Sequence, residues 1–274
     1  MPELPEVDTV RRTLEPFIVG RRIESVEINY GGIIKKPEPA EFIRLVEGRV
    51  IRVIKRRGKY LLIQLDAEYT LVIHLRMTGQ LTICERNSAL SKHTHLIFRF
   101  ENGRELRFVD VRKFGMVYLI PIGAWHEAGG LARLGPEPLE DEFTLCSFCE
   151  IIKGKKGKLK AFLLDQTRIA GIGNIYADEI MFAAGLSPQR QIETLSSKET
   201  ELLYENIRAK LNEGVEHQGT SIRDYVNGLG EKGGFQHRLK VYDRAGQPCA
   251  RCGTSLLKAT VCGRGTVYCP HCQH

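Results

Sequence analysis

The 274-residue sequence lacks several features that would place it in a specialised class of protein. It has no uninterrupted apolar run near the roughly 18 to 20 residues that a membrane-spanning helix needs. Its first residues, Met1–Glu6, contain neither the basic segment nor the apolar segment of a secretory signal peptide. No repeat longer than a Cys-x2-Cys pair occurs, and eight cysteines are too few for a disulfide scaffold. We therefore expect a cytoplasmic protein in a reducing compartment, with no membrane partner.

The composition is that of a folded protein with an unevenly basic surface. Hydrophobic residues make up 42% and charged residues 27%, which excludes a disordered or collagen-like chain. At roughly 150 residues per domain, the length predicts two domains. The net charge is +7, and the basic residues cluster: segment 236–274 holds six of them against one acid, and segment 153–160 holds five lysines. Such clustering indicates a polyanionic partner, because binding to phosphates releases counterions; a solvated basic face is the alternative.

Apolar periodicity predicts that the first half of the chain is rich in strands. Residues from Pro5 to about Pro16 have helical spacing, and Asn102-Gly103 is a strong hairpin-turn signal. Many short strands separated by turn residues predict an antiparallel sandwich or barrel. We expect a short helix over Glu41–Val46 and strands over Arg22–Tyr30, Val50–Lys55, Tyr60–Leu65, Thr70–Leu75, Gln80–Cys84, Thr94–Phe100, Glu105–Val109 and Met116–Ile120.

The second half of the chain changes to a helical period after a linker rich in glycine and proline at about 122–145. Apolar residues recur at helical spacing within 159–163, 175–181 and 202–211. Segment 214–236 has no clear period and holds six glycines. A glycine-rich loop of that length is usually functional or mobile.

Four cysteines near the C-terminus have the spacing of a zinc site. Two Cys-x2-Cys pairs stand sixteen residues apart: Cys249, Cys252, Cys269 and Cys272. Four thiolates leave no open position on the metal, so the zinc is expected to be structural. Strands over Leu256–Val261 and Thr266–Cys269 are expected to place Arg264 at the tip of a hairpin. There it would bind phosphate or be a solvated turn residue.

The N-terminus offers a nucleophile. If Met1 is removed, Pro2 presents a secondary amine, and an α-amino group titrates near pH 8, so a neutral fraction exists. A secondary amine that attacks a sugar carbon yields an iminium, which withdraws electrons without protonation. Glu3 could move protons beside it. A proline-rich lead into a helix is the simpler alternative.

Several collinear motifs together resemble formamidopyrimidine-DNA glycosylase, the bacterial enzyme that removes oxidised purines from DNA. The resemblance spans nearly the whole chain. It rests on Met1–Val7, His74–Met77, Asp110–Gly115, Gly171–Tyr176, Cys249–Cys272 and Gly263–Thr266. Leu4 and the long glycine-rich loop argue against the related endonuclease VIII branch, which prefers oxidised pyrimidines. A zinc-ribbon nucleic-acid binder without activity is a second alternative.

The resemblance implies a bifunctional glycosylase and abasic-site lyase with named catalytic residues. Pro2 would attack C1′ and form a Schiff base, and Glu3 would assist as general acid and base. Lys59 would hold a phosphate and assist β-elimination. Arg264 would contact the same phosphate region and assist δ-elimination, and Asn174 would join them.

The resemblance also implies contacts that open and read the DNA. Further DNA-binding residues would be His74, His93, Arg112 and Lys156. Met77, Arg112 and Phe114 would form a wedge that fills the stack vacated by the everted nucleotide; in a strand-rich segment, Met77 and Phe114 would otherwise be core. The turn before a helix at Ile175–Ala184, with Asn174 at its N-cap, would bind phosphate or be an ordinary capped helix.

The glycine-rich loop at 218–235 would be the lesion-recognition loop. Within it, Thr220, Ser221, Arg223 and Tyr225 are the candidate readers of the damaged base. Saturation of N7 in an oxidised purine turns an acceptor into a donor, which backbone or hydroxyl groups could read.

Three departures from the family pattern accompany the resemblance. Asp8 stands where the family commonly has Glu, and Thr78 stands where many relatives have Glu. Four cysteines lie outside the pattern: Cys84, Cys146, Cys149 and Cys262. We interpret them as free thiols; a second metal site would need four convergent ligands.

The predicted fold is α+β, with an N-terminal helix and antiparallel β-sandwich domain and a C-terminal helix-two-turn-helix domain that carries a zinc-finger β-hairpin. The predicted parts are a catalytic domain over 1–130, a linker over 131–146, a helical domain over 147–236 and a zinc finger over 237–274. Damaged double-stranded DNA would occupy a basic cleft between the domains. We expect a monomer associated with the bacterial nucleoid when it is bound to DNA, with one structural Zn2+ and no nucleotide cofactor.

Overall fold

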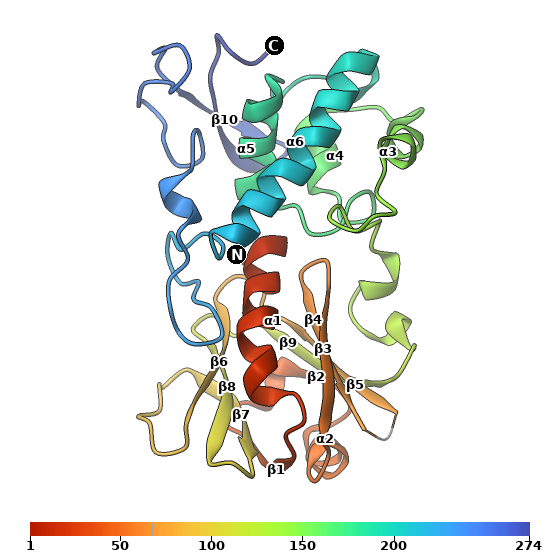
Figure 1. The fold of residues 1–274 in the computed structure, drawn as a ribbon, viewed down its shortest axis with the longest axis vertical. Helices are drawn as coiled ribbons and strands as arrows, with labels where there is room; N and C mark the ends of the chain where they lie inside the picture. The colour runs from red at the N-terminus through yellow and green to blue at the C-terminus, as the bar shows by residue number, and fades with distance from the viewer. Residues whose placement is uncertain (67) are drawn as a thin grey trace. The chain divides into compact units, whose positions relative to one another are not determined.

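The computed structural model describes residues 1–66 and 68–274. These residues form two compact units (Figure 1). Unit 1 comprises residues 1–133 and 217–236, and unit 2 comprises residues 134–216 and 237–274. The glycine-rich loop therefore packs with the N-terminal residues, whereas the sequence analysis grouped it with the helical domain. The predicted boundaries at residues 130 and 146 stay predictions.

Unit 1 is built around two sheets that form the predicted β-sandwich. One sheet has the order β1-β7-β8-β6 and the other β2-β9-β5-β4-β3. Neighbouring strands are antiparallel except for the β2–β9 pair. The strands are β1 (Ile23–Ile28), β2 (Ile34–Lys36), β3 (Ile51–Arg57), β4 (Tyr60–Leu65), β5 (Tyr69–His74), β6 (Gly79–Glu85), β7 (Thr94–Phe100), β8 (Arg104–Asp110) and β9 (Met116–Pro121).

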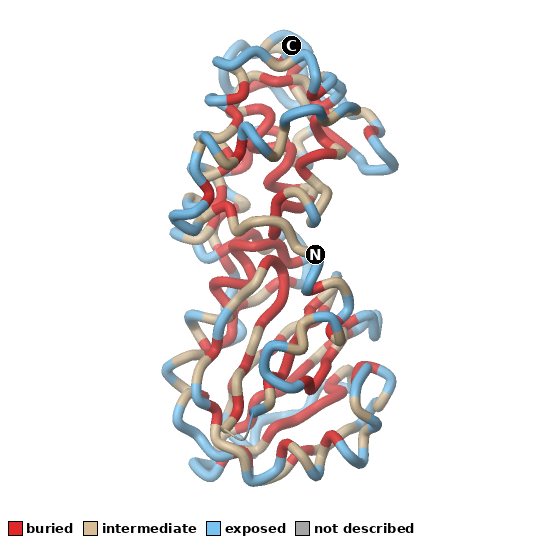
Figure 2. Tube along the Cα trace, turned by 90° about the vertical axis from the view of Figure 1, so that its right-hand side faces the viewer, coloured by how far each residue is buried: buried red, intermediate tan, exposed pale blue. Residues whose placement is uncertain are grey.

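Strands β4 and β6 have the alternation of buried and less buried residues that a period of two predicts, whereas β5, β7, β8 and β9 are buried along most of their length. The buried stretches of the chain are red in Figure 2. The eight predicted strands are present, and β4 and β7 have the predicted bounds. The three-residue β2 was not predicted, because it is too short to show a period.

Helix α1 (Leu4–Ile18) joins the two sheets into one core. It packs against β3 and β4 of one sheet and β6 of the other. The face that contacts them carries apolar residues at helical spacing: Val7, Val10, Leu14 and Ile18. The helix continues two residues beyond Pro16, since a proline in the last turn removes only one backbone hydrogen bond. Helix α2 (Pro39–Val46) includes the predicted short helix. The 3-10 turns of unit 1 are η1 (Gly31–Ile33), η2 (Trp125–Glu127), η3 (Leu131–Arg133) and η5 (Phe235–His237); η5 crosses the boundary between the two units.

Unit 2 begins as a group of helices, as predicted. They are α3 (Leu145–Ile152), α4 (Leu159–Leu164), α5 (Asn174–Ala184) and α6 (Ser197–Glu216), with the 3-10 turn η4 (Ile192–Thr194) before α6. Helices α5 and α6 pack closely because Gly214 leaves room for the buried ring of Tyr176; a Cβ at Gly214 would lie 2.4 Å from the tyrosine oxygen. Of the helices within the described residues, none is both long and apolar enough to cross a bilayer.

Unit 2 ends in a small antiparallel hairpin of β10 (Leu257–Val261) and β11 (Arg264–Tyr268). Its two-residue turn is Cys262-Gly263, and both residues have positive φ, which is typical of a type I′ turn. The predicted position of Arg264 at the tip is therefore wrong. Arg264 is the first residue of β11, pairs with Val261, and is exposed.

Candidate functional site

The N-terminal residues are held at the start of α1. Glu3 is the N-cap residue, and its backbone N–H donates to Oε2 of Glu6 at 2.8 Å as one half of a capping box. Pro2 is buried and Glu3 is 2% exposed, whereas Met1 is exposed. The capping box thus fixes the backbone next to Pro2.

Glu6 also ties the glycine-rich loop to α1. Its Oε1 accepts the backbone N–H of Thr220 at 2.7 Å. The hydroxyl of Tyr225 lies 3.3 Å from the carbonyl oxygen of Glu6 and 3.1 Å from that of Gln218. Burial raises the pKa of Tyr225, and the charge of Glu6 adds to this, so the hydroxyl keeps its proton and donates. The loop and the N-terminus are therefore positioned by one carboxylate.

The four candidate lesion readers differ in exposure. Thr220 and Tyr225 are buried, and Arg223 is exposed. Ser221 is partly buried and cross-links the loop, since its Oγ donates to the Tyr225 carbonyl at 2.8 Å and accepts the Gly233 N–H at 2.9 Å. In this structure the side chains of Thr220 and Tyr225 pack inside the unit.

Lys59 and His74 lie at the same end of two neighbouring strands. Lys59 directly precedes β4, is 6% exposed, and adjoins Tyr60, which pairs with His74 at the end of β5. Burial, together with the charges of Arg76 and Lys59, lowers the pKa of His74 to about 3. His74 is therefore neutral at physiological pH. Because its Nδ1 accepts the Arg76 N–H at 2.9 Å, its Nε2 carries the proton and can donate.

Met77, Arg112 and Phe114 are exposed on two adjacent loops of unit 1, and Arg112 contacts both of the others. We call these three side chains the wedge residues. Arg112 Nη1 lies 3.2 Å from the sulfur of Met77, and the Arg112 guanidinium carbon lies 4.6 Å from the centre of the Phe114 ring. Met77 is 43% and Phe114 50% exposed, so they do not belong to the core. Apolar side chains grouped on a surface indicate a contact with another molecule.

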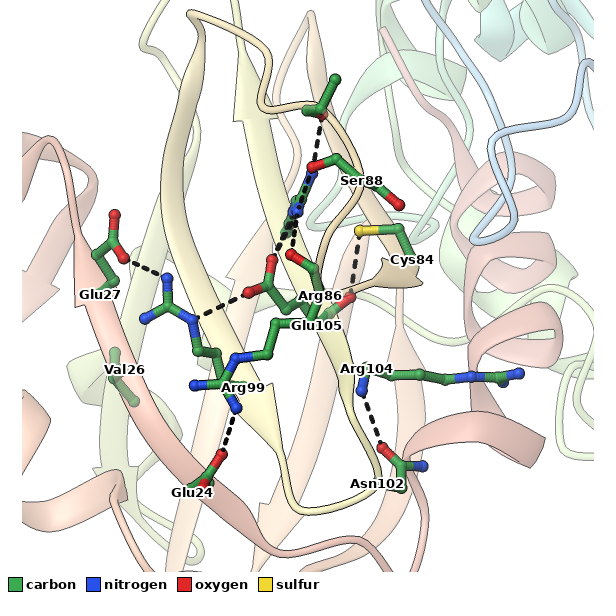
Figure 3. A network of polar contacts seen from close by, with 12 residues as sticks. Glu24, Val26, Glu27, Cys84, Arg86, Ser88, Arg99, Asn102, Arg104 and Glu105 are labelled. Carbon is green, nitrogen blue, oxygen red and sulfur yellow. Dashed lines mark hydrogen bonds and ion pairs between the residues drawn. The ribbon is translucent and has the colours of Figure 1, made fainter.

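His93 follows a loop that a buried ion network supports. Glu105 on β8 is 2% exposed and accepts from Arg99 at 2.9 Å and from Arg107 at 2.7 Å. Figure 3 shows Arg99 between Glu27 and Glu105. Arg107 then donates to the carbonyl oxygens of Ser88 and Ala89, both at 3.0 Å. The network was not predicted, because its members come from separate strands.

The turn before α5 meets the zinc hairpin. The N-cap of α5 is Gly173, so the prediction that Asn174 is the N-cap is wrong; Asn174 is the first helical residue. Its Nδ2 donates to the carbonyl oxygen of Gly265 at 3.0 Å, next to Arg264 in β11. Asn174 therefore lies close in space to the residue that follows Arg264, although the two are distant in the sequence. Both Asn174 and Arg264 were predicted to contact phosphate.

The lysine run at 153–160 was predicted to face a polyanionic partner, and for Lys160 this is wrong. Its side chain is fully buried and forms an ion pair with Asp178, with 2.7 Å between Nζ and Oδ1. The same Nζ donates to the Gly265 carbonyl at 3.2 Å and to Oγ1 of Thr266 at 2.5 Å. Asp178 also accepts the Val267 N–H at 3.2 Å. The pair thus anchors β11 to the helices, while Lys156 of the same run is exposed.

Glu179 is a structural residue that the sequence analysis missed. It is 1% exposed, and its carboxylate accepts the backbone N–H groups of Lys240, Val241 and Tyr242 at 2.9–3.0 Å. It holds the segment that enters the zinc module. An acidic residue on the apolar face of a predicted helix was the available signal.

The four predicted zinc ligands converge. Their sulfur atoms lie within 4.8 Å of one another, with Cys249 to Cys272 at 3.9 Å and Cys252 to Cys269 at 3.5 Å. Zn–S bonds of about 2.3 Å place tetrahedral sulfurs about 3.8 Å apart, so the set fits zinc. Backbone N–H groups of Arg251 and Cys272 point to two of the sulfurs. The other four cysteines lie elsewhere, on β6, on α3 and in the β10–β11 turn.

Comparisons with known proteins cover the whole chain. Family models match for the formamidopyrimidine-DNA glycosylase N-terminal domain over residues 1–117, for the H2TH domain of the same glycosylase over 134–226, and for the zinc finger found in FPG and IleRS over 246–274. The formamidopyrimidine-DNA glycosylases of Carboxydothermus hydrogenoformans and Geobacillus kaustophilus are 50% and 48% identical over the full length of both chains.

Solved structures give the same result. A Lactococcus lactis FPG mutant in complex with Fapy-dG containing DNA matches with a TM-score of 0.93 and 37% identity over the full length of both chains. MutM (FPG) from Thermus thermophilus matches with a TM-score of 0.89 and 41% identity over 99% of this chain and 98% of its own. The chain described here therefore belongs to the formamidopyrimidine-DNA glycosylase family, as a zinc-containing DNA glycosylase and abasic-site lyase of base excision repair.

Proposed function

We propose that this enzyme removes oxidised purines, 8-oxoguanine and formamidopyrimidines, from duplex DNA and then cleaves the strand. One observation carries the proposal: the Glu6 carboxylate holds both the backbone beside Pro2 and the loop at 218–235. A nucleophile and a loop that can cover a base are thus positioned together in unit 1. The names of the relatives, and their complexes with Fapy-dG and abasic-site DNA, support the substrate class.

The chemistry begins at Pro2 once Met1 is removed. The neutral secondary amine attacks C1′ of the damaged nucleotide, the N-glycosidic bond breaks, and the base leaves with the bonding pair and a proton. The attached amine then loses its proton and the C1′–O4′ bond breaks with protonation of O4′, which opens the sugar ring. The iminium that results carries a positive charge without protonation. Loss of a C2′ proton then breaks the C3′–O bond by β-elimination, and a second elimination breaks the C5′–O bond. Glu3, next in the chain and buried, transfers the protons.

The phosphates flanking the lesion require fixed donors. In unit 1, Lys59 supplies a cation and His74 a neutral N–H donor, since the pKa of His74 is lowered to about 3. His93 is partly exposed and adds a contact from the neighbouring loop. In unit 2, the exposed Lys156 and Arg264 supply cations. Such contacts position the DNA without reading its sequence.

The wedge residues replace the everted nucleotide in the stack. Met77 and Phe114 present apolar surface, and the Arg112 guanidinium can donate to the orphaned base opposite the lesion. The contacts of Arg112 with both Met77 and Phe114 support insertion as one group.

The loop at 218–235 closes over the everted base. The exposed Arg223 is the candidate reader in this loop that faces solvent, whereas Thr220 and Tyr225 anchor the loop to α1. Deleting the loop is expected to reduce removal of 8-oxoguanine and to spare cleavage at abasic sites. Equal loss of both activities would contradict this role. We further propose that the enzyme acts as a monomer and without a nucleotide cofactor.

Product analysis tests the function. A duplex with 8-oxoguanine opposite cytosine should yield the free base and a one-nucleotide gap with phosphate at both ends, and Pro2→Gly should yield neither. Pro5→Ala is the matched control, because Pro5 lies in the first turn of α1, three residues from Pro2, but carries no free amine. Faster release of oxidised pyrimidines than of 8-oxoguanine would favour the endonuclease VIII alternative. DNA binding with no base release would favour a binding protein.

A further inference from the structure

We propose that Asp110 and Thr78 are positioning residues that lock the wedge residues into one rigid group for insertion into DNA. The inference deepens the proposed function and rests on it. It concerns two side chains that lie below the wedge and would not touch the base.

The two loops that carry the wedge leave neighbouring strand ends. Strands β6 and β8 pair, and Gly79 at the start of β6 lies opposite Asp110 at the end of β8. Met77 precedes this point in one loop, and Arg112 follows it in the other. A link between the loops at this position would therefore fix both parts of the wedge.

Asp110 supplies that link. It is fully buried. Its Oδ2 accepts the N–H of Gly115 at 2.7 Å, and its Oδ1 accepts the N–H of Arg112 at 3.1 Å. The carboxylate thus spans residues 112–115 and holds both ends of the segment that displays Arg112 and Phe114.

Thr78 connects the second loop to the same carboxylate. Its hydroxyl donates to Oδ1 of Asp110, and its oxygen lies 3.3 Å from the N–H of Arg112. The two backbone N–H groups belong to the segment 112–115 itself, whereas the Thr78 hydroxyl comes from the loop before β6. It joins the loop of Met77 to the loop of Arg112.

The surroundings allow little movement of this carboxylate. The main-chain oxygen of Asp110 lies 2.7 Å from Nε2 of His95, and its N–H donates to the His93 carbonyl at 3.0 Å. A Cβ at Gly115 would lie 2.3 Å from the Phe108 ring and 3.2 Å from Oδ2 of Asp110, so glycine is required for this close approach. Exposed side chains on a fixed base lose less conformational freedom when they bind, which favours insertion.

The test compares Thr78→Val, which keeps the shape and removes the donor, with Thr78→Ser, which restores it. One readout is single-turnover removal of 8-oxoguanine opposite cytosine. The other is the fluorescence of 2-aminopurine placed opposite a tetrahydrofuran abasic analogue, at saturating enzyme, which reports contact of the wedge with the orphaned base. Thr82→Val on β6 is the matched control.

We expect Thr78→Val to slow excision about fivefold, as for the loss of one hydrogen bond, and to reduce the 2-aminopurine amplitude, with Thr78→Ser and Thr82→Val both like the wild type. An unchanged amplitude would overturn the inference, even with slower excision, because a merely structural role does not alter a saturated complex. If Thr78→Val does not fold, Thr78→Ala takes its place. Failure of the wild type to excise 8-oxoguanine would contradict the proposed function instead, since the amplitude series does not depend on excision.

Discussion

Replacing Lys160 by methionine should leave a buried carboxylate without its cation. The side chains of Lys160 and Asp178 are 0% and 1% exposed, so water cannot take the place of the ammonium group. The variant also loses the hydrogen bonds from Nζ to Gly265 and Thr266 in the zinc hairpin. Asp178 keeps the Val267 N–H at 3.2 Å.

The expected loss of stability is about 3 to 5 kcal/mol near neutral pH, the usual cost of removing one partner of a buried ion pair. Burial raises the pKa of Asp178 to about 6, even though the charge of Lys160 lowers it. Without Lys160 this pKa rises further, and each unit adds about 1.4 kcal/mol at a pH above the new value. A carboxyl whose pKa is higher in the folded state destabilises the fold when it ionises. The loss should therefore be larger at pH 8 than at pH 5, where Asp178 is protonated in both proteins.

Urea unfolding at both pH values measures this loss. Far-UV circular dichroism follows the helices of both units, four of which lie in unit 2, so the transition of unit 2 is the part of this signal that should shift. The single tryptophan, Trp125, reports on unit 1 and should show an unchanged transition. The double variant Lys160→Met with Asp178→Leu removes both charges and should recover much of the stability. A loss below about 1 kcal/mol, or an equal loss at pH 5 and pH 8, would refute the reasoning.

Three further predictions concern the metal, a glycine and a pH dependence. Purified enzyme should contain one zinc per chain, and two would contradict the assignment of the extra cysteines as free thiols. Removal of the zinc by a chelator should abolish DNA binding and leave the Trp125 fluorescence unchanged, because structural zinc folds its own segment. Gly115→Ala should lower stability by about 1 to 3 kcal/mol in thermal unfolding, because its Cβ would meet Phe108, whereas Gly265→Ala, with open space around it, should change it little. Burial tends to raise the pKa of Asp8, but the hydrogen bond from Arg11 and nearby arginine charges lower it overall. Asp8→Asn should therefore cost about 2 kcal/mol at pH 7. The difference from the wild type should shrink as the pH falls from the ordinary pKa of 3.8 through the lowered pKa of the folded state, where the wild type also loses this contribution; a difference as large at pH 2.5 as at pH 7 would contradict it.

Local patterns were enough to predict most of the elements and the zinc site. Strands such as β4 show their period within six residues, and the four cysteines need only the right spacing. The apolar face of α1 follows the same logic. In each case the signal and the structure involve residues that are near in the sequence.

Interactions between distant residues were not predictable in this way. Lys160 has the same charge as its exposed neighbours, and its burial depends on Asp178 and on Thr266, which is 106 residues away. The contact between Glu6 and Thr220 spans 214 residues, so the grouping of the loop with α1 has no local signal. Arg264 does not lie at the tip because the turn consists of Cys262 and Gly263, both with positive φ. A glycine signals such a conformation in the sequence, but a cysteine does not.

The central claim is that the N-terminal amine of Pro2 is the nucleophile. Borohydride reduction during the reaction with an 8-oxoguanine duplex, followed by mass spectrometry of the digested adduct, tests it most directly. The account predicts a covalent DNA adduct on the N-terminal peptide, attached to the nitrogen of Pro2, and no adduct with Pro2→Gly. An adduct on a lysine such as Lys59, or base release without any adduct, would contradict it.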